Sequence, residues 1–220
     1  MRKSFRLQAV TTLIVLASAV VYAKREFVMP ATQVATAYPA HDEHKDEGVA
    51  VAIDPYDMPD KAKVFIVDYA ESGYLPILLV VTNNTDQPIS LAGMKAQFVT
   101  VDRVKLAPAR EDDLYRRLSR PARNDGPSPL PFPRKKVKGA VGREALDELK
   151  NSQFGAKAVE PHSSQAGFLF FEVGGISTPL PGAQFYLTGA RNAKGEDLLY
   201  FEIPLEKYLS APAAAPAAHQ

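Results

Sequence analysis

Three short runs of β-branched and aromatic residues constrain the fold of this chain most strongly. They occupy residues 73–84, 166–173 and 197–203, and each is closed by Asn, Asp, Gly or Pro. Runs of this length and composition are typical of β-strands, and the polar residues that close them favour turns. The pattern therefore predicts a mainly β chain built as an antiparallel β-sandwich.

Further strands are predicted from alternation along the chain. Large and small residues alternate over 49–53, and 63–68, 94–101 and 183–188 are also expected to be strands. The run from Tyr74 to Thr82 is continuously apolar, so we expect both of its faces to be buried, with Pro76 near the start of the strand. In the last strand, Leu199, Phe201 and Ile203 are expected to share one face, and Gly195 is expected to take a positive φ in the preceding turn.

The β pattern is interrupted by a helical, Pro-rich insertion at 107–155. Arg110 to Arg120 predicts a short helix, because Leu114 and Leu118 share a face and acidic residues precede basic ones along it. Ion pairs at a spacing of four are expected within it, Asp112 with Arg116 and Asp113 with Arg117. Residues 121–138 carry Pro at 127, 129, 131 and 133. A second helix is expected over 143–154, with Leu146 and Leu149 facing inward.

The N-terminus predicts export. Residues 1–23 have a basic start, an apolar centre and a small residue at Ala23, which is the pattern of a secretory signal peptide. The mature protein would be periplasmic or extracellular. The alternative is an uncleaved membrane anchor, the only membrane contact that we expect. Residues 24–47 are predicted to form an extended lead-in that ends in a solvated charged run at 41–47, 48–208 the sandwich, and 209–220 a disordered Ala- and Pro-rich tail.

Composition excludes several classes of protein. The chain has no Cys, so disulfides, thiolate metal sites and lipid-modified N-terminal cysteines are excluded. Its formal charge of +1 becomes −2 once the three basic residues of the signal segment are removed. That balance argues against a nucleic-acid-binding protein.

The turn and core residues resemble those of a known group of proteins. The run 83–91 precedes a strand, 159–171 leads into the Phe-rich strand, and 200–205 closes the sheet. This arrangement resembles secreted bacterial immunoglobulin-like domains of unknown function. The blocks 111–120, 135–136 and 143–149 also look like acidobacterial-type exported proteins. The resemblance implies an immunoglobulin-like sandwich over 48–208 and specifies no chemistry, because sandwiches host many functions.

Two groups of residues are candidates for metal sites. His41, His44 and His162, with the carboxylates around the first two, are suitable ligands for a divalent ion, although a solvated acidic linker at 41–47 is the stronger hypothesis. Asp54, Asp57 and Asp60 lack the Gly and the distal Glu of an EF-type loop, so turn formation is favoured over calcium binding. No nucleophile with a partner base stands out, and no cofactor is expected.

Basic residues gather in and beside the insertion, and they form the predicted binding surface. The set comprises Arg116, Arg117, Arg120, Arg134, Lys135, Lys136 and Lys138. Such a surface suits an anionic component of the cell envelope or an acidic protein. The sequence therefore predicts an exported, non-catalytic binding or structural module, with a metal-binding protein as the alternative.

Overall fold

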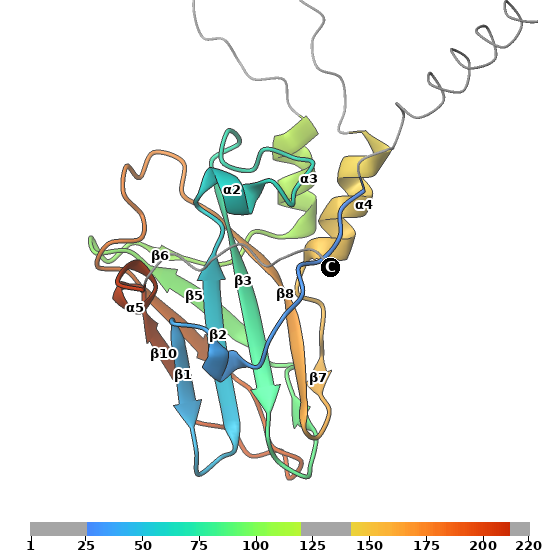
Figure 1. Cartoon of the computed structure of the whole chain (residues 1–220), viewed down its shortest axis with the longest axis vertical. Helices are drawn as coiled ribbons and strands as arrows, with labels where there is room; N and C mark the ends of the chain where they lie inside the picture. Colours follow the sequence, from blue (N-terminus) through green and yellow to red (C-terminus); the bar gives the residue numbers. More distant parts are fainter. Residues whose placement is uncertain (1–25, 120–141, 212–220) are drawn as a thin grey trace, which may run out of the picture.

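The computed structural model describes residues 26–119 and 142–211 as a mainly β chain with antiparallel sheets and few helices (Figure 1). The predicted signal peptide at 1–23 lies outside the described residues, as does most of the predicted tail. Within the described ranges, no helix is long and apolar enough to cross a membrane.

One sheet has the strand order β1-β2-β3-β8, and each strand is antiparallel to its neighbour. Its strands are β1 (His41–His44), β2 (Val49–Pro55), β3 (Tyr74–Asn83) and β8 (Ser163–Glu172). The β3–β8 ladder runs from Tyr74 opposite Glu172 to Asn83 opposite Ser163. Pro76 is tolerated in the central strand because it lies opposite the chain just beyond the end of β2. Its carbonyl accepts the Tyr56 N–H there, and no ladder bond needs the N–H that proline lacks.

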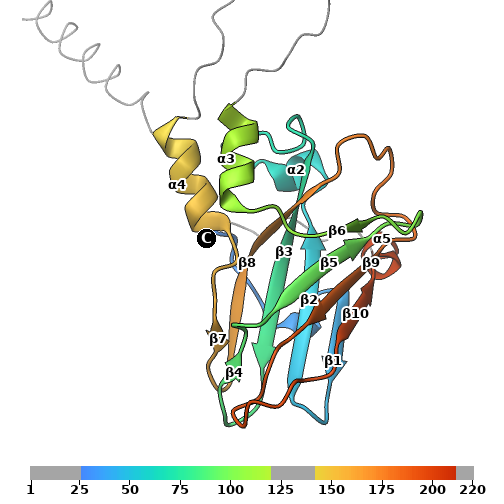
Figure 2. The same ribbon diagram turned by 180° about the vertical axis from the view of Figure 1, so that it is seen from behind.

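A second sheet has the order β10-β9-β5-β6, again antiparallel throughout (Figure 2). It consists of β5 (Lys95–Val99), β6 (Lys105–Leu106), β9 (Gln184–Thr188) and β10 (Phe201–Pro204). A two-stranded ribbon joins β4 (Ile89–Ser90) to β7 (Ala158–Val159). The predicted turn before β10 is confirmed, because Gly195 has a φ of +81° and donates its N–H to Asn192 O.

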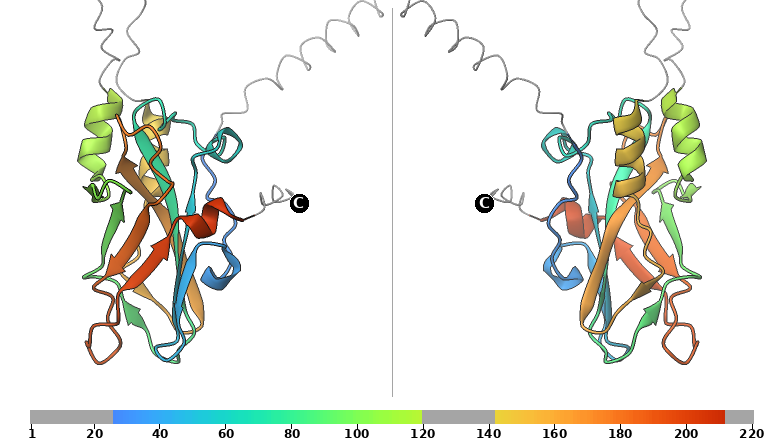
Figure 3. Two further views of the ribbon diagram at one scale, coloured as in Figure 1. Left: turned by 90° about the vertical axis from the view of Figure 1, so that its left-hand side faces the viewer. Right: turned by 90° about the vertical axis from the view of Figure 1, so that its right-hand side faces the viewer.

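Alternation along β3 and β8 places side chains in two hydrophobic clusters. Leu75, Ile77 and Leu79 face the second sheet, and Figure 3 shows the two sheets as stacked layers seen from the side. Their partners there include Phe98, Phe185 and Phe201. Tyr74, Leu78 and Val80 point the other way into what we call the outer cluster. The prediction that β3 is buried on both faces is confirmed, since all ten of its residues are buried.

Half of the buried residues of the outer cluster are aromatic. Phe65 and Phe168 pack edge to face with ring centroids 4.8 Å apart, and Tyr56 meets Phe168 at the same distance. Phe27 stacks on Phe65, and Tyr69 lies against Phe170. Such pairs add to the free energy gained from burying the rings. This cluster forms the base on which the insertion rests.

Five short helices occur in the described residues. They are the 3₁₀ helix η1 (Ala35–Ala37) and the α-helices α2 (Pro59–Ala62), α3 (Glu111–Ser119), α4 (Arg143–Ser152) and α5 (Glu206–Leu209). Both predicted helices of the insertion are confirmed as α3 and α4. Figure 1 shows α2, α3 and α4 gathered at one end of the layers, where β3 begins and β8 ends.

Three secondary-structure predictions were wrong. His41–His44 forms a strand within 41–47, the segment expected to be a solvated linker. Residues 63–68 form no strand; this loop instead inserts Phe65 into the outer cluster. Leu199 is 66% exposed rather than sharing the core face of Phe201, because β10 begins only after it.

Candidate functional site

Two hydrogen bonds fasten both ends of the insertion to β8. Ala109 donates its N–H to Phe170 O at 2.7 Å, and Phe154 donates its N–H to Phe168 O at 3.0 Å. Because β8 pairs with β3 along its inner edge only, both acceptors lie on its outer edge. The insertion therefore begins and ends beside one strand, at points two residues apart.

Gly167 permits this close approach. A Cβ atom at that position would lie 2.5 Å from Phe154 Cα and 2.7 Å from Phe154 N, closer than atoms can come without a shift of backbone. A side chain at 167 is thus incompatible with the observed course of residues 153–154. This explains in physical terms why a Gly interrupts an otherwise bulky strand.

Helix α3 lies on the outer cluster through its apolar face. Leu114 is completely buried and Leu118 is half-buried against the same cluster, as the spacing predicted. The acidic first turn and the basic last turn suit the helix dipole. The predicted ion-pair spacing was wrong by one residue, because Arg116 pairs with Asp113 at a spacing of three.

Only two members of the predicted basic surface fall within the described residues. Arg116 pairs with Asp113, and Arg117 Nη1 lies 3.7 Å from Glu172 Oε1. Both arginine side chains remain at least half exposed, so both are open to a further anionic partner. The other members, Arg120, Arg134, Lys135, Lys136 and Lys138, lie outside the described residues.

Helix α4 carries a buried carboxylate. Glu148 is 1% exposed, and its two carboxylate oxygens accept the backbone N–H groups of Ile66 and Val67. Leu149 is buried beside it, as predicted, whereas Leu146 is half-buried. Burial first, and then the charge of Glu148, raise the pKa of the Tyr69 hydroxyl. Glu148 thus ties the insertion to the loop that supplies Phe65.

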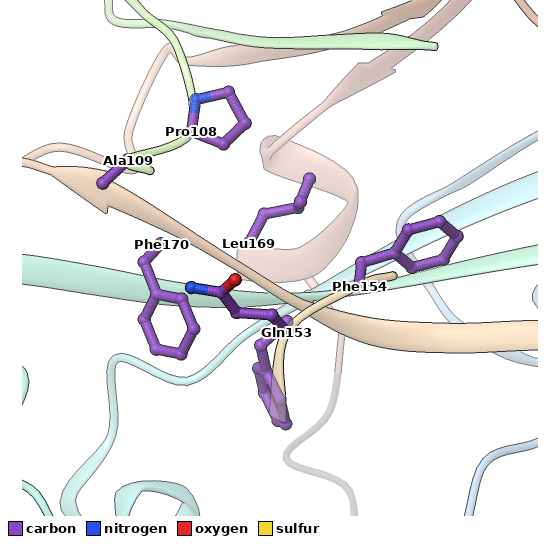
Figure 4. A pocket seen from close by; sticks show the side chains of 7 residues that line it. Pro108, Ala109, Gln153, Phe154, Leu169 and Phe170 are labelled. Atoms are coloured by element: carbon purple, nitrogen blue, oxygen red, sulfur yellow. The ribbon is translucent and has the colours of Figure 1, made fainter. Parts of the chain in front are cut away.

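A pocket of about 170 Å³ opens between the two anchoring hydrogen bonds. Figure 4 shows its lining side chains, with the amide of Gln153 extending among them. The wall consists of Pro108, Ala109, Gln153, Phe154, Phe168, Leu169 and Phe170. The Gln153 amide nitrogen is buried and has no hydrogen-bond partner. A buried amide donor without an acceptor is uncommon in native structures, where an ordered water or a bound group satisfies it.

The aspartates of the candidate calcium loop make contacts within the protein. Asp54 pairs with Lys61 at 2.5 Å, and Asp57 accepts the Tyr208 hydroxyl at 2.7 Å. Lys61 Nζ also lies 4.6 Å from the centre of the Tyr208 ring. Burial raises the pKa of Asp54, and the hydrogen bond and charge of Lys61 oppose that rise. These contacts tie α2 and α5 to the end of β2.

The three histidines of the metal hypothesis are not brought together. His44 lies opposite Val49, which lies opposite Asn83, which in turn lies opposite Ser163, so His44 and His162 are at opposite edges of a four-stranded sheet. Three strand spacings separate them by roughly 14 Å. His162 instead bonds Asp86 at 2.8 Å. No group of three or more potential ligands that could hold a metal ion occurs in the ranges 26–119 and 142–211.

The first two histidines belong to a seam between the sheets. His41 contacts Tyr38 O, whereas the His44 ring stacks on Phe201 with centroids 4.2 Å apart. The carboxylates of Asp42 and Glu47 accept the N–H groups of Glu202 and Leu199. The acidic segment 41–47 therefore closes one side of the two layers, a role that sequence reasoning missed.

Sequence reasoning also missed Glu148, Gly167 and Gln153 as determinants of the site. One signal was present for Glu148: Ala145, Glu148, Leu149 and Ser152 lie on one helical face, so a carboxylate is directed at the core. Nothing comparable marks Gln153, whose importance depends on chain segments more than 40 residues earlier in the sequence.

The sequence matches no known family model and no curated protein. The likeness to secreted immunoglobulin-like domains accordingly stays a prediction from the residues that carry it.

Proposed function

We propose that this chain is an exported, non-catalytic binding module of the bacterial cell envelope. It uses its basic insertion to bind an anionic envelope component, either a polymer or an acidic protein. The observation that supports this most is the firm attachment of the insertion, whose two ends bond positions two residues apart on β8 and whose helices bury Leu114 and Leu149. A loop anchored in this way on a rigid scaffold is a common setting for binding residues.

We further propose that the scaffold is an immunoglobulin-like sandwich. The order β2-β3-β8 corresponds to strands A, B and E of that fold, and β10-β9-β5-β6 corresponds to G, F, C and C′. In this correspondence β1 is an added edge strand. The insertion then occupies the connection between C′ and E, which joins one sheet to the other.

The chemistry of the proposed contact is electrostatic. Between Arg116 and Lys138 the sequence carries eight basic residues and one acidic residue, Asp125. A concentration of positive charge attracts anionic partners and raises the rate of their association. Such binding weakens as salt screens the charges, over a distance of about 8 Å at physiological ionic strength.

The test is affinity capture of the mature protein from an envelope fraction. Replacing Arg134, Lys135, Lys136 and Lys138 by Ser should abolish capture of the specific partner and leave the fold intact. A matched control replaces four exposed lysines elsewhere, Lys95, Lys105, Lys157 and Lys194, and so removes the same charge. Capture that survives in the first variant, or is lost equally in both, contradicts a role for the insertion.

A further inference from the structure

We propose that the pocket at the base of the insertion binds an extended segment of a partner polypeptide, through a backbone carbonyl and an adjacent apolar side chain. This site is distinct from the basic residues of the proposed function, and either can fail without the other. It lies between the Ala109–Phe170 and Phe154–Phe168 hydrogen bonds.

Two hydrogen-bond donors face the pocket. The first is the Gln153 amide nitrogen, which is buried and has no partner. The second is the backbone N–H of Phe170. The carbonyl of Phe170 points to the outer edge of β8, where Ala109 meets it. A strand residue directs its N–H and C=O to the same side, so the N–H of Phe170 also points away from β3.

The donors require an acceptor, and the lining defines its chemistry. All seven lining residues are uncharged, so a neutral carbonyl oxygen suits the site better than a carboxylate or phosphate, whose charge would be left unpaired. A strand-edge N–H that receives the carbonyl of an extended peptide is a recurrent mode of peptide recognition. Gln153 supplies a second donor beside it.

The remaining space and its walls define the rest of the ligand. A cavity of about 150 Å³ accepts a benzene-sized group, and this one measures about 170 Å³. Its apolar surface comes from Pro108, Phe154 and Leu169 together with the two anchoring phenylalanines. A single Phe, Leu or Met side chain therefore fits the volume, and the adjoining carbonyl meets the polar part of the lining.

The probe for this proposal is N-acetyl-phenylalaninamide, titrated into the mature protein and followed by amide NMR. Saturable shifts at Phe170 N–H, Ala109 N–H and the Gln153 side-chain amide are expected. Gln153→Leu keeps the size of the side chain and removes the unpaired donor. This variant should weaken binding by about 3- to 10-fold, the effect of one hydrogen bond, without lowering the stability of the free protein.

A second variant keeps the proposal falsifiable if the first folds poorly. Ala109→Leu fills the pocket and retains the backbone N–H that bonds Phe170, so it should abolish the shifts. Equal binding by both variants and the unmodified protein, or no saturable shift, overturns the proposal. Toluene that binds as tightly as the capped amide would identify an apolar void only. A ligand-free dimer whose interface protects Phe170 would identify a second copy as the occupant. Both the toluene result and the dimer result would contradict binding of a partner peptide.

Discussion

Glu148 Oε1 accepts the backbone N–H of Val67 at 3.2 Å, although 81 residues separate them in the sequence. The second oxygen of the same carboxylate accepts the neighbouring N–H of Ile66. A helix of the insertion is thereby joined to a loop of the sheet that carries it. The insertion is part of the packed structure, and this relationship allows its attachment to be tested residue by residue.

Glu148→Gln should loosen α4 from that loop. An amide offers one acceptor oxygen where the carboxylate offers two, so one buried N–H loses its partner at a cost of about 1–3 kcal/mol. Hydrogen exchange at the Ile66 and Val67 amides should accelerate in the variant. Asp147→Asn, a change at the exposed neighbouring position, is the control and should leave both amides protected. Unchanged protection in Glu148→Gln would contradict the attachment.

Leu114→Ala should destabilise the whole domain, since Leu114 is completely buried in the outer cluster. Deleting a buried leucine side chain costs about 2–5 kcal/mol. Chemical denaturation should show one cooperative transition with a lower midpoint. Tyr115→Ala, at the exposed neighbouring position, serves as the comparison and should shift the midpoint little. A fall in the free energy of unfolding of less than about 1 kcal/mol would show that Leu114 does not pack in the outer cluster.

Gly167→Ala should displace the end of the insertion, because the added methyl would meet the Phe154 backbone. Overpacking of this kind typically costs about 1–3 kcal/mol. Gly155 is the matched position, since a Cβ there meets nothing within 4 Å. Thermal unfolding of the two alanine variants provides the measurement, and equal midpoints would refute the close approach.

The pair formed by Asp54 and Lys61 predicts a dependence of stability on pH. Burial raises the pKa of Asp54 above its ordinary 3.8. As the pH rises from below 3.8, Asp54 loses its proton first in the unfolded chain. The free energy of unfolding therefore falls until Asp54 has also ionised in the folded state. Lys61→Met removes the interaction that limits the pKa rise and should deepen this fall.

Urea denaturation of Lys61→Met near pH 3 and pH 7 tests that prediction. The variant's free energy of unfolding should lie about 1–3 kcal/mol below that of the unmodified protein near pH 7, where Asp54 is left charged and unpaired. The difference should be smaller near pH 3. Lys63→Met provides a control at an exposed ion pair with Asp60, where little change is expected. The same loss at both pH values would exclude Asp54 as the cause.

The sequence predicted those elements whose own residues determine them. The continuous apolar run of β3 and the Phe-rich β8 allow few alternatives, and Leu114 and Leu118 fall on one face of α3 at the spacing of a helix. In these segments local preference and tertiary packing favour the same structure, so the predictions of β3, β8, α3 and α4 are confirmed.

Elements determined by distant partners could not be predicted. His41–His44 has the composition of a solvated linker and becomes a strand because β2 supplies a ladder and Glu202 of β10 supplies an amide for Asp42. Residues 63–68 have the composition of a strand, yet Phe65 is required in the outer cluster. The pocket depends in the same way on Ala109, Gln153 and Phe170 meeting across an insertion.

The most direct test of the central claim replaces residues 120–141 by a Gly/Ser linker of about eight residues, a flexible connection of neutral composition. Thermal unfolding and capture from the envelope fraction are then measured on the same protein. We predict an unchanged unfolding midpoint, because the two hydrophobic clusters keep all their residues, together with loss of the captured partner. Retained capture would show that the binding surface lies elsewhere on the domain and would contradict the account.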